Sequence, residues 1–302
     1  MSTIALVVML LNIVLGQVEG IVVKEYGKRH KIGGMFFNAI ICAFAGLFFV
    51  IKEGFFTDTS KFYFPLALMP YALLSCIMYA VGFYTMYRAL QLGSFGMTKL
   101  IASFSMVITI VYGIAFLGER PHPLTYIAMA LVCLSVVLMR IEGVKENKDD
   151  KSDNGFSLKW LVYLILCVVS NGFISILTRQ QQIVFDGICD CEFKMISTFG
   201  ACILLMMLGF ILEKQNLGYI VKHGSLYGAV AGLVNGGKNF LHLIIYNLAA
   251  ISISTPMTTG VGLVISFLLS IFLYKEKFTK LQAYAAGVGF VAFILFQVAA
   301  EL

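Results

Sequence analysis

The chain has 302 residues, of which 60% are hydrophobic and 13% charged, and its formal net charge is +6. Its mean hydropathy is +0.90. A soluble domain has about 45–50% apolar and about 25% charged residues, so the composition indicates a membrane protein. The small positive charge is typical of loop lysines that face an anionic lipid surface. The sequence has no basic domain that would predict a nucleic-acid partner.

Long apolar segments follow one another along the chain. A helix needs about 20 apolar residues to cross the hydrocarbon core. Ten segments meet this requirement approximately: 3–23, 33–51, 66–89, 94–117, 122–140, 160–179, 193–212, 225–248, 252–273 and 279–299. Runs of this length and uniformity favour helices over the strands of a barrel. We therefore expect an all-α integral membrane protein with ten transmembrane helices.

A polar, mixed-charge linker at 141–159 divides the chain into two parts, 1–140 and 160–302. The parts resemble each other: residues 116–138 align with 273–295, which places Glu119 on Glu276, and Asn12 falls on Asn171. Each part has five segments, so the second part enters the membrane from the opposite side. This predicts two inverted five-helix repeats, an architecture of many secondary transporters.

The segment GLVNGGKNFLHLIIYN at 232–247 is unusually polar for a deep apolar run. Asn235, Lys238, Asn239, His242 and Tyr246 recur at three- and four-residue steps, which places them on one helix face. A lysine at the bilayer centre costs roughly 2.5–3.5 kcal/mol, so it faces a cavity or a partner. We interpret the face as a cavity wall on which Lys238 attracts a substrate carboxylate or phosphate.

A structural role is the alternative for this polar face. Lys238 would then form an ion pair, for instance with Glu19, or the polar side chains would join helices to one another. The neighbouring pair Gly236–Gly237 also has two interpretations. It loosens the helix, as in the discontinuous helices of transporters, or it allows tight packing.

Further candidates for the substrate site lie in other segments. Asn12 and Glu19 are seven residues apart and share a helix face, and Gln17 lies between them. A desolvated carboxylate can carry a proton near neutral pH, which makes Glu19 a proton-coupling candidate; its alternative is contact with headgroup water. Asn171, through its match with Asn12, and Tyr84 are expected at the same cavity, with an aromatic belt as the alternative for Tyr84.

Lysine and arginine are distributed unevenly among the loops. The loops after even-numbered segments hold only Lys52, Lys61, Arg120 and Lys194, and the other loops hold many more. Because Lys and Arg favour the cytoplasmic side, this count places both termini outside. Lys99 lies near the start of its segment and is expected to extend towards the headgroups.

Two stretches resemble a known family. FLGERPHPLTYIAMALVCLSVVLM at 116–139 resembles the signature of the EamA family of the drug/metabolite transporter superfamily, and YRALQLGSFGMTKLIASFS at 87–105 is similar to the family's junction between the third and fourth helices. The resemblance implies ten helices in two inverted repeats, no ATPase, and alternating access. It also implies a cavity lined mainly by helices one, three, four, six, eight and nine.

The resemblance has three complications. It implies cytoplasmic termini, the opposite of the charge count. Met106 stands about where family members usually carry proline, and Gln17 stands where the related small multidrug transporters carry a proton-binding glutamate. The proton-coupling role of that glutamate is therefore not carried over.

Our leading hypothesis is a secondary transporter that exports a small polar metabolite, such as an amino acid, from a bacterium through the plasma membrane. Its expected partners are the substrate, membrane lipid and a proton or another coupling ion, with the chain as a monomer or homodimer. Multidrug or cation efflux and flipping of a lipid-linked sugar are alternatives. No HExxH motif, paired-Asp metal motif or Ser/His/Asp set indicates an enzyme, and no cofactor or metal site is predicted. The paired asparagines argue against a purely structural or receptor role.

Overall fold

The computed structural model describes residues 3–30, 34–56, 64–93, 95–119, 122–146, 158–213, 217–275 and 280–301. Helices make up nearly all of these residues, and no strand occurs among them. Within these ranges, six helical stretches are long and apolar enough to cross a membrane: Ile4–His30, Met35–Gly54, Leu66–Leu92, Thr98–Phe116, Lys159–Val184 and Asp190–Leu212. The chain is therefore an all-α, multi-pass membrane protein.

The helices follow one another with short connections. They are α1 (Thr3–His30), α2 (Met35–Phe56), α3 (Met69–Leu92), α4 (Phe95–Ala102), α5 (Ser105–Phe116), α6 (Pro123–Glu146), α7 (Leu158–Val184), α8 (Asp190–Leu208), α9 (Leu217–Leu248), α10 (Ile251–Phe272) and α11 (Lys280–Glu301). A 3-10 helix at Leu66–Leu68 precedes α3, and a π-helix at Gly209–Glu213 follows α8.

The segment predicted as one helix at 94–117 is interrupted. It forms α4 and α5, which meet at the turn Ser103–Phe104. The backbone bonds there are short in range: the Phe104 amide donates to the Ile101 carbonyl at 3.0 Å, and the Met106 amide donates to the Ser103 carbonyl at 3.1 Å. Such i→i+3 bonds tighten the chain and mark a break in an α-helix. The discontinuity thus lies in this segment, whereas α9 is continuous through Gly236–Gly237.

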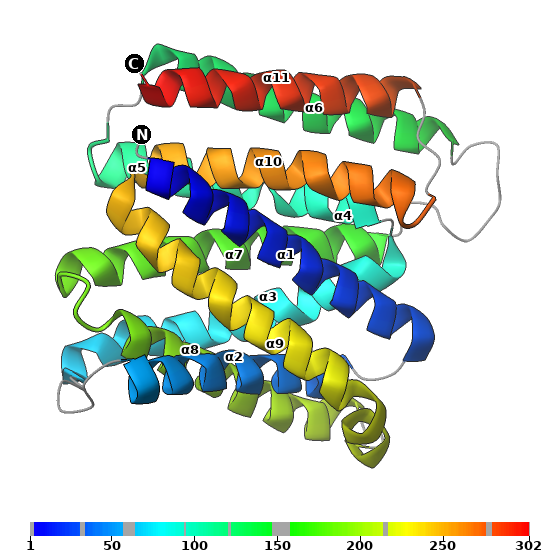
Figure 1. Cartoon of the computed structure of the whole chain (residues 1–302). Helices are drawn as coiled ribbons and strands as arrows, with labels where there is room; N and C mark the ends of the chain where they lie inside the picture. Colours follow the sequence, from blue (N-terminus) through cyan, green and yellow to red (C-terminus); the bar gives the residue numbers. More distant parts are fainter. Residues whose placement is uncertain are drawn as a thin grey trace.

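The helices lie side by side, and the start of α1 and the end of α11 lie at the same end of the bundle (Figure 1). α2 packs against α8 and α9, α1 against α9, and α3 against α7 and α8. α6 and α11 pack against each other at one edge of the bundle (Figure 1). α10 contacts α1, α4, α5 and α11. Helices from the two parts of the chain are therefore in contact throughout the bundle.

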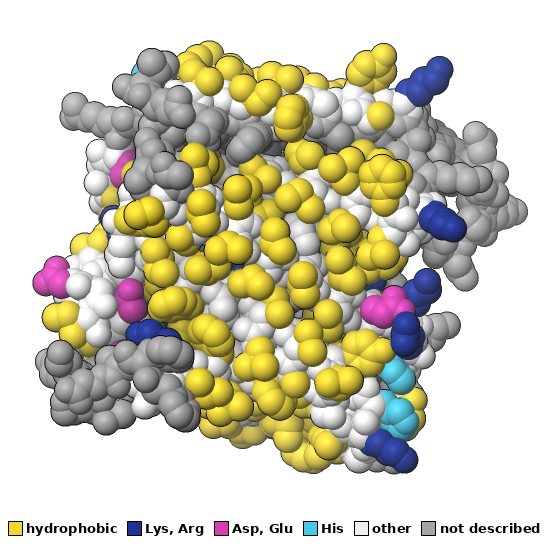
Figure 2. Space-filling view, viewed as in Figure 1, with side chains coloured by type: hydrophobic (Ala, Val, Ile, Leu, Met, Phe, Trp, Pro, Cys, Tyr) yellow, Lys and Arg dark blue, Asp and Glu magenta, His cyan; other side chains and the backbone are white. Residues whose placement is uncertain are grey.

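The outer surface suits a lipid environment. Figure 2 shows hydrophobic side chains across the middle of one face, with Lys, Arg, Asp and Glu at its margins. Leu10, Leu11, Ile203 and Leu226 are among the exposed hydrophobic side chains. A soluble monomer rarely exposes a contiguous apolar area of this extent, whereas such side chains pack against lipid tails in a bilayer.

Glycines allow α9 to approach α2 closely. A Cβ on Gly232 would lie 2.5 Å from the Ile41 carbonyl oxygen and 2.6 Å from Phe44 Cβ. A Cβ on Gly236 would lie 2.6 Å from Phe48 Cβ. Small residues are what permit such backbone contact between membrane helices. Of the two interpretations of the Gly236–Gly237 pair, tight helix packing is the one that the surroundings of Gly236 support.

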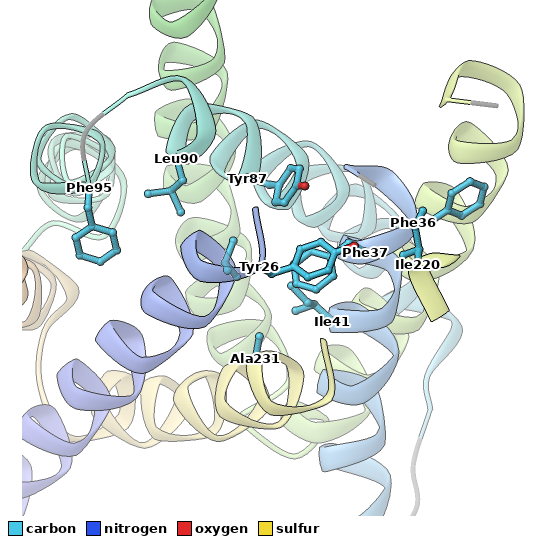
Figure 3. Close-up of a cluster of buried hydrophobic side chains, with 10 residues drawn as sticks. Tyr26, Phe36, Phe37, Ile41, Tyr87, Leu90, Phe95, Ile220 and Ala231 are labelled. Atoms are coloured by element: carbon cyan, nitrogen blue, oxygen red, sulfur yellow. The ribbon is translucent and has the colours of Figure 1, made fainter. Parts of the chain in front are cut away.

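An apolar cluster fills the opposite end of the bundle from the termini (Figure 3). Its buried aromatic side chains include Tyr26, Phe37 and Tyr87, and the rings of Tyr26 and Phe37 stack with centroids 3.8 Å apart. Val23 and Leu90 belong to this cluster and also line the central cavity. The cluster therefore forms one apolar wall of the site described next.

Candidate functional site

A cavity of about 310 Å³ lies among helices from both parts of the chain. Its lining comes from α1, α3, α4, α5, α7, α9 and α10, with Asn38 from α2. These include all the helices that the family resemblance implied. The polar lining comprises Asn12, Gln17, Glu19, Asn38, Tyr79, Tyr87, Lys99, Ser103, Ser105, Asn171, Ser175, Asn235, Lys238, Asn239, His242, Thr255, Thr258, Thr259 and Ser266. A cavity with these groups inside an apolar bundle can hold a small polar molecule.

The polar face of α9 contributes four of its members to the cavity. Asn235, Lys238, Asn239 and His242 all line it. Tyr246, one turn further, is buried outside the lining and contacts His242 with ring centroids 5.3 Å apart. The helical spacing thus placed the face correctly, and the neighbours of each side chain follow from the packing of α9 against α1 and α2.

Lys238 forms an ion pair with Glu19 of α1. The second carboxylate oxygen of Glu19, Oε1, accepts a hydrogen bond from Asn235 Nδ2 at 2.7 Å. The side chains of Lys238 and Glu19 are 25% and 12% exposed, so the pair is shielded without being sealed. The structure thus shows the ion pair that was the alternative interpretation of Lys238. Glu19 neutralises the ammonium group that was expected to attract the substrate.

A chain of hydrogen bonds leads from this ion pair to α8. Asn239 Nδ2 donates to Asn235 Oδ1 at 2.8 Å, and Tyr79 OH donates to Asn239 Oδ1 at 2.7 Å. Lys194 Nζ in turn donates to Tyr79 OH at 3.0 Å and to Thr178 Oγ1 at 2.7 Å. The chain connects α1, α9, α3 and α8, which are helices from both parts of the sequence.

Lys194 corrects the earlier count of loop charges. It was assigned to a loop, but its side chain lies in the first turns of α8 and is only 1% exposed. Because Lys194 is buried inside the bundle and donates to two neutral acceptors, it does not belong in a count of charges at the membrane surface. Its position four residues after Asp190, at the start of an apolar run, was the available signal in the sequence.

Lys99 also differs from its predicted place. It was expected to extend towards the headgroups, but it lines the cavity from α4, one turn before the break at Ser103–Phe104. Its Nζ lies 5.8 Å from the centroid of the Phe95 ring. A Cβ on Gly20 of α1 would lie 2.8 Å from the same Nζ, so the absence of a side chain there makes room for the ammonium group.

Three further predicted residues line the cavity from α1 and α7. Asn12 Nδ2 donates to the Lys238 carbonyl at 2.7 Å, and Gln17 Nε2 donates to the Gly262 carbonyl of α10 at 2.8 Å. Asn171 donates from Nδ2 to Cys167 Sγ at 3.2 Å. Asn12 and Gln17 thus join α1 to α9 and α10, in addition to lining the cavity.

Tyr84 is the predicted site residue that the structure places elsewhere. It is not part of the lining, and its hydroxyl accepts a hydrogen bond from Arg88 Nε at 3.2 Å. Its ring meets Tyr163 edge-on. Tyr79, five residues earlier on α3, lines the cavity instead. Five residues are about 500° of helix, or 140° around the axis, which is enough to place the two rings in different surroundings.

Side-chain hydrogen bonds join the last turns of α7 to the last turns of α9. Arg179 Nη1 donates to the Tyr246 carbonyl at 2.7 Å, and Gln182 Nε2 donates to the Leu243 carbonyl at 3.2 Å. Gln180 of α7 accepts a hydrogen bond from Tyr112 of α5. These polar side chains link α7 to helices of both parts of the chain.

The fold and the polar cavity define a multi-pass membrane protein with a central binding site. Residues 3–141 match the family model described as the EamA-like transporter family. This part of the chain is therefore similar to the EamA-like transporters, which belong to the drug/metabolite transporter superfamily. The resemblance recognised in the sequence is confirmed.

A solved structure titled "Crystal structure of protein" is similar to this chain, with a TM-score of 0.71 and 12% sequence identity. The match covers 100% of this chain and 99% of the other, so the shared fold also includes residues 142–302 beyond the family match. A comparison with curated proteins finds no match.

Proposed function

We propose that the chain is a secondary transporter that exports a small polar metabolite, such as an amino acid, by alternating access around the central cavity. The observation that carries this proposal is the cavity itself. It has about 310 Å³, it lies among helices of both parts of the chain, and polar side chains line it inside an apolar bundle. A site at the interface of two structural units is where rocking of one unit against the other changes access.

The pairing of helices supports ten crossings in two inverted repeats. If α7–α11 repeat α1–α6, with α4 and α5 together as one crossing, then a contact between α1 and α9 corresponds to one between α7 and α3. Both contacts occur. Helices that correspond to each other across such an axis also pair, as α2 does with α8 and α6 with α11.

The lining supports a small substrate with both donor and acceptor groups. Within the described residues, the side-chain carbonyl oxygens of Asn12 and Asn171 receive no hydrogen bond. They can accept hydrogen bonds from an ammonium or amide group of a bound molecule. The volume is at the small end of the range for ligand pockets, roughly 300–1,000 Å³, which favours a metabolite over a large lipid-linked sugar.

Efflux of lipophilic cations is less well supported. A cationic drug needs an available carboxylate, and the one carboxylate of the described lining, Glu19, is engaged by Lys238 and Asn235. The described lining also carries two lysines, whose charges repel a cation.

Uptake into liposomes containing the purified protein tests the proposal. The panel contains radiolabelled neutral amino acids, lactate, uracil and tetraphenylphosphonium. We expect accumulation of at least one amino acid by the wild type. Asn171→Leu should reduce it at least tenfold, whereas Lys222→Gln, at an exposed position outside the lining, should leave it unchanged. If folded wild-type protein moves none of the panel, the proposal is wrong; transport of tetraphenylphosphonium alone would replace it with cation efflux.

A further inference from the structure

Three charged side chains face the cavity within the described part of its lining. Lys99 and Lys238 carry positive charges and Glu19 carries a negative one, so the sum is +2 − 1 = +1. Lys238 and Glu19 compensate each other in their ion pair. The remaining positive charge belongs to Lys99, whose side chain lies against Gly20 of α1.

The ammonium group of Lys99 forms no ion pair with a described residue, since the carboxylate of Glu19 is in contact with Lys238. No carboxylate of the described residues lies within ion-pair distance of its Nζ, and no hydrogen bond holds it. Its described electrostatic contact is a cation–π contact with the face of the Phe95 ring. A charged lysine inside a membrane protein is costly unless a partner or water solvates it, and it carries three donors.

We infer that Lys99 Nζ binds the carboxylate of the transported molecule, and that this molecule carries a single carboxylate. The inference rests on the proposed transport function and specifies its substrate class. The described lining carries one more positive than negative side chain, and one carboxylate group on the ligand complements this difference. A dicarboxylate or a phosphate dianion would bring a second negative charge without a partner, because Lys238 is already paired with Glu19.

The surroundings of Lys99 fit this role. It lies one turn before the break between α4 and α5, and Ser103 and Ser105 on either side of that break also line the cavity. Gly20 provides the space in which the ammonium group lies. The lysine therefore reaches the cavity from a discontinuous helix, while the pair Lys238–Glu19 stays as a fixed link between α1 and α9.

Matched pairs of acids and amides test the inference directly. Wild-type proteoliposomes are given radiolabelled lactate or lactamide, and L-leucine or L-leucinamide, with succinate as the dicarboxylate. We expect the wild type to take up the acid of at least one pair tenfold or more faster than its amide, and to exclude succinate. Lys99→Gln should abolish this preference, and Lys99→Arg and the exposed control Lys159→Gln should retain it.

The outcomes separate this inference from the proposed function. Uptake of acid and amide at equal rates, or an unchanged preference in Lys99→Gln, overturns the role of Lys99 while transport itself stands. Uptake of none of the compounds by the wild type overturns the proposed function.

A second measurement avoids dependence on variants that fail to fold. Wild-type protein is acetylated with sulfosuccinimidyl acetate, and modification of Lys99 and Lys159 is quantified by mass spectrometry. Lactate, which has no amine to consume the reagent, should protect Lys99 at least fivefold relative to lactamide, with Lys159 unaffected. Equal modification of Lys99 in the presence of acid and amide contradicts the inference.

Discussion

Glu19 and Lys238 join α1 to α9 through an ion pair inside the cavity, although 219 positions separate them in the sequence. Asn235, one turn before Lys238, secures the other oxygen of the same carboxylate. Glu19 therefore holds two members of the polar face of α9 at once. Removing it leaves a cation and an amide without their acceptor.

Replacing Glu19 by Gln should destabilise the protein by about 2 kcal/mol, below the roughly 3–5 kcal/mol for a fully buried pair, because both side chains retain some exposure. The measurement is the thermal unfolding midpoint of the purified protein. Glu19→Gln combined with Lys238→Gln should recover part of the loss, since no charge is then left alone. Glu25→Gln, which removes the exposed pair with Arg29, is the matched control and should change little. A midpoint as high in Glu19→Gln as in the wild type would show that the pair does not support the fold.

The contact between α2 and α9 gives a prediction about glycine. Gly232→Ala should cost about 1–3 kcal/mol of stability, because its Cβ would meet the Ile41 carbonyl oxygen at 2.5 Å, a backbone atom that cannot turn away. Gly237→Ala on the same helix is the control: its Cβ would meet Leu15 Cδ1 at 3.4 Å, an ordinary contact. That variant should be neutral, or stabilising by about 0.5–1 kcal/mol through helix propensity. Equal melting points for the two variants would contradict this account of the packing.

Tyr79 connects the buried Lys194 to the asparagines of α9. Tyr79→Phe removes the hydroxyl that accepts a hydrogen bond from Lys194 and donates one to Asn239 Oδ1. We therefore expect the free energy of unfolding to fall by about 1–3 kcal/mol. Tyr84→Phe on the same helix removes a hydroxyl whose partner is the nearby Arg88, and it should be nearly neutral. Thermal unfolding of the two variants side by side gives the comparison, and a larger loss in Tyr84→Phe would reverse the assignment.

The single tryptophan reports on the region of Lys99. Trp160 of α7 is 4% exposed, and its Nε1 donates to Thr98 Oγ1 of α4 at 3.3 Å, next to Lys99 in the sequence. A carboxylate that binds Lys99 should therefore produce a saturable change in Trp160 emission. Titration of the wild type with lactate or L-leucine should show it, and Lys99→Gln should not. An identical titration curve for Lys99→Gln would indicate that the ligand binds elsewhere.

The sequence determined the class of fold through local properties. Apolar runs long enough to span a bilayer must satisfy their backbone groups internally, so they form helices wherever they lie in the chain. The polar face of α9 was equally predictable, because a period of three and four residues belongs to the helix itself. Asn235, Lys238, Asn239 and His242 accordingly share the cavity.

The tertiary structure decided which partner each polar side chain meets. Lys238 had two interpretations, attraction of a substrate group or an ion pair with Glu19, and the structure shows the ion pair. Lys99 was expected near the headgroups and lines the cavity. Lys194 was assigned to a loop and is buried, and Tyr84 lies outside the cavity that Tyr79 lines. The partner of a charge depends on how helices that are distant in sequence rotate and tilt against one another. Interhelical contacts such as the one between Gly232 and Ile41 set that geometry. It cannot be predicted from the hydropathy of a single helix.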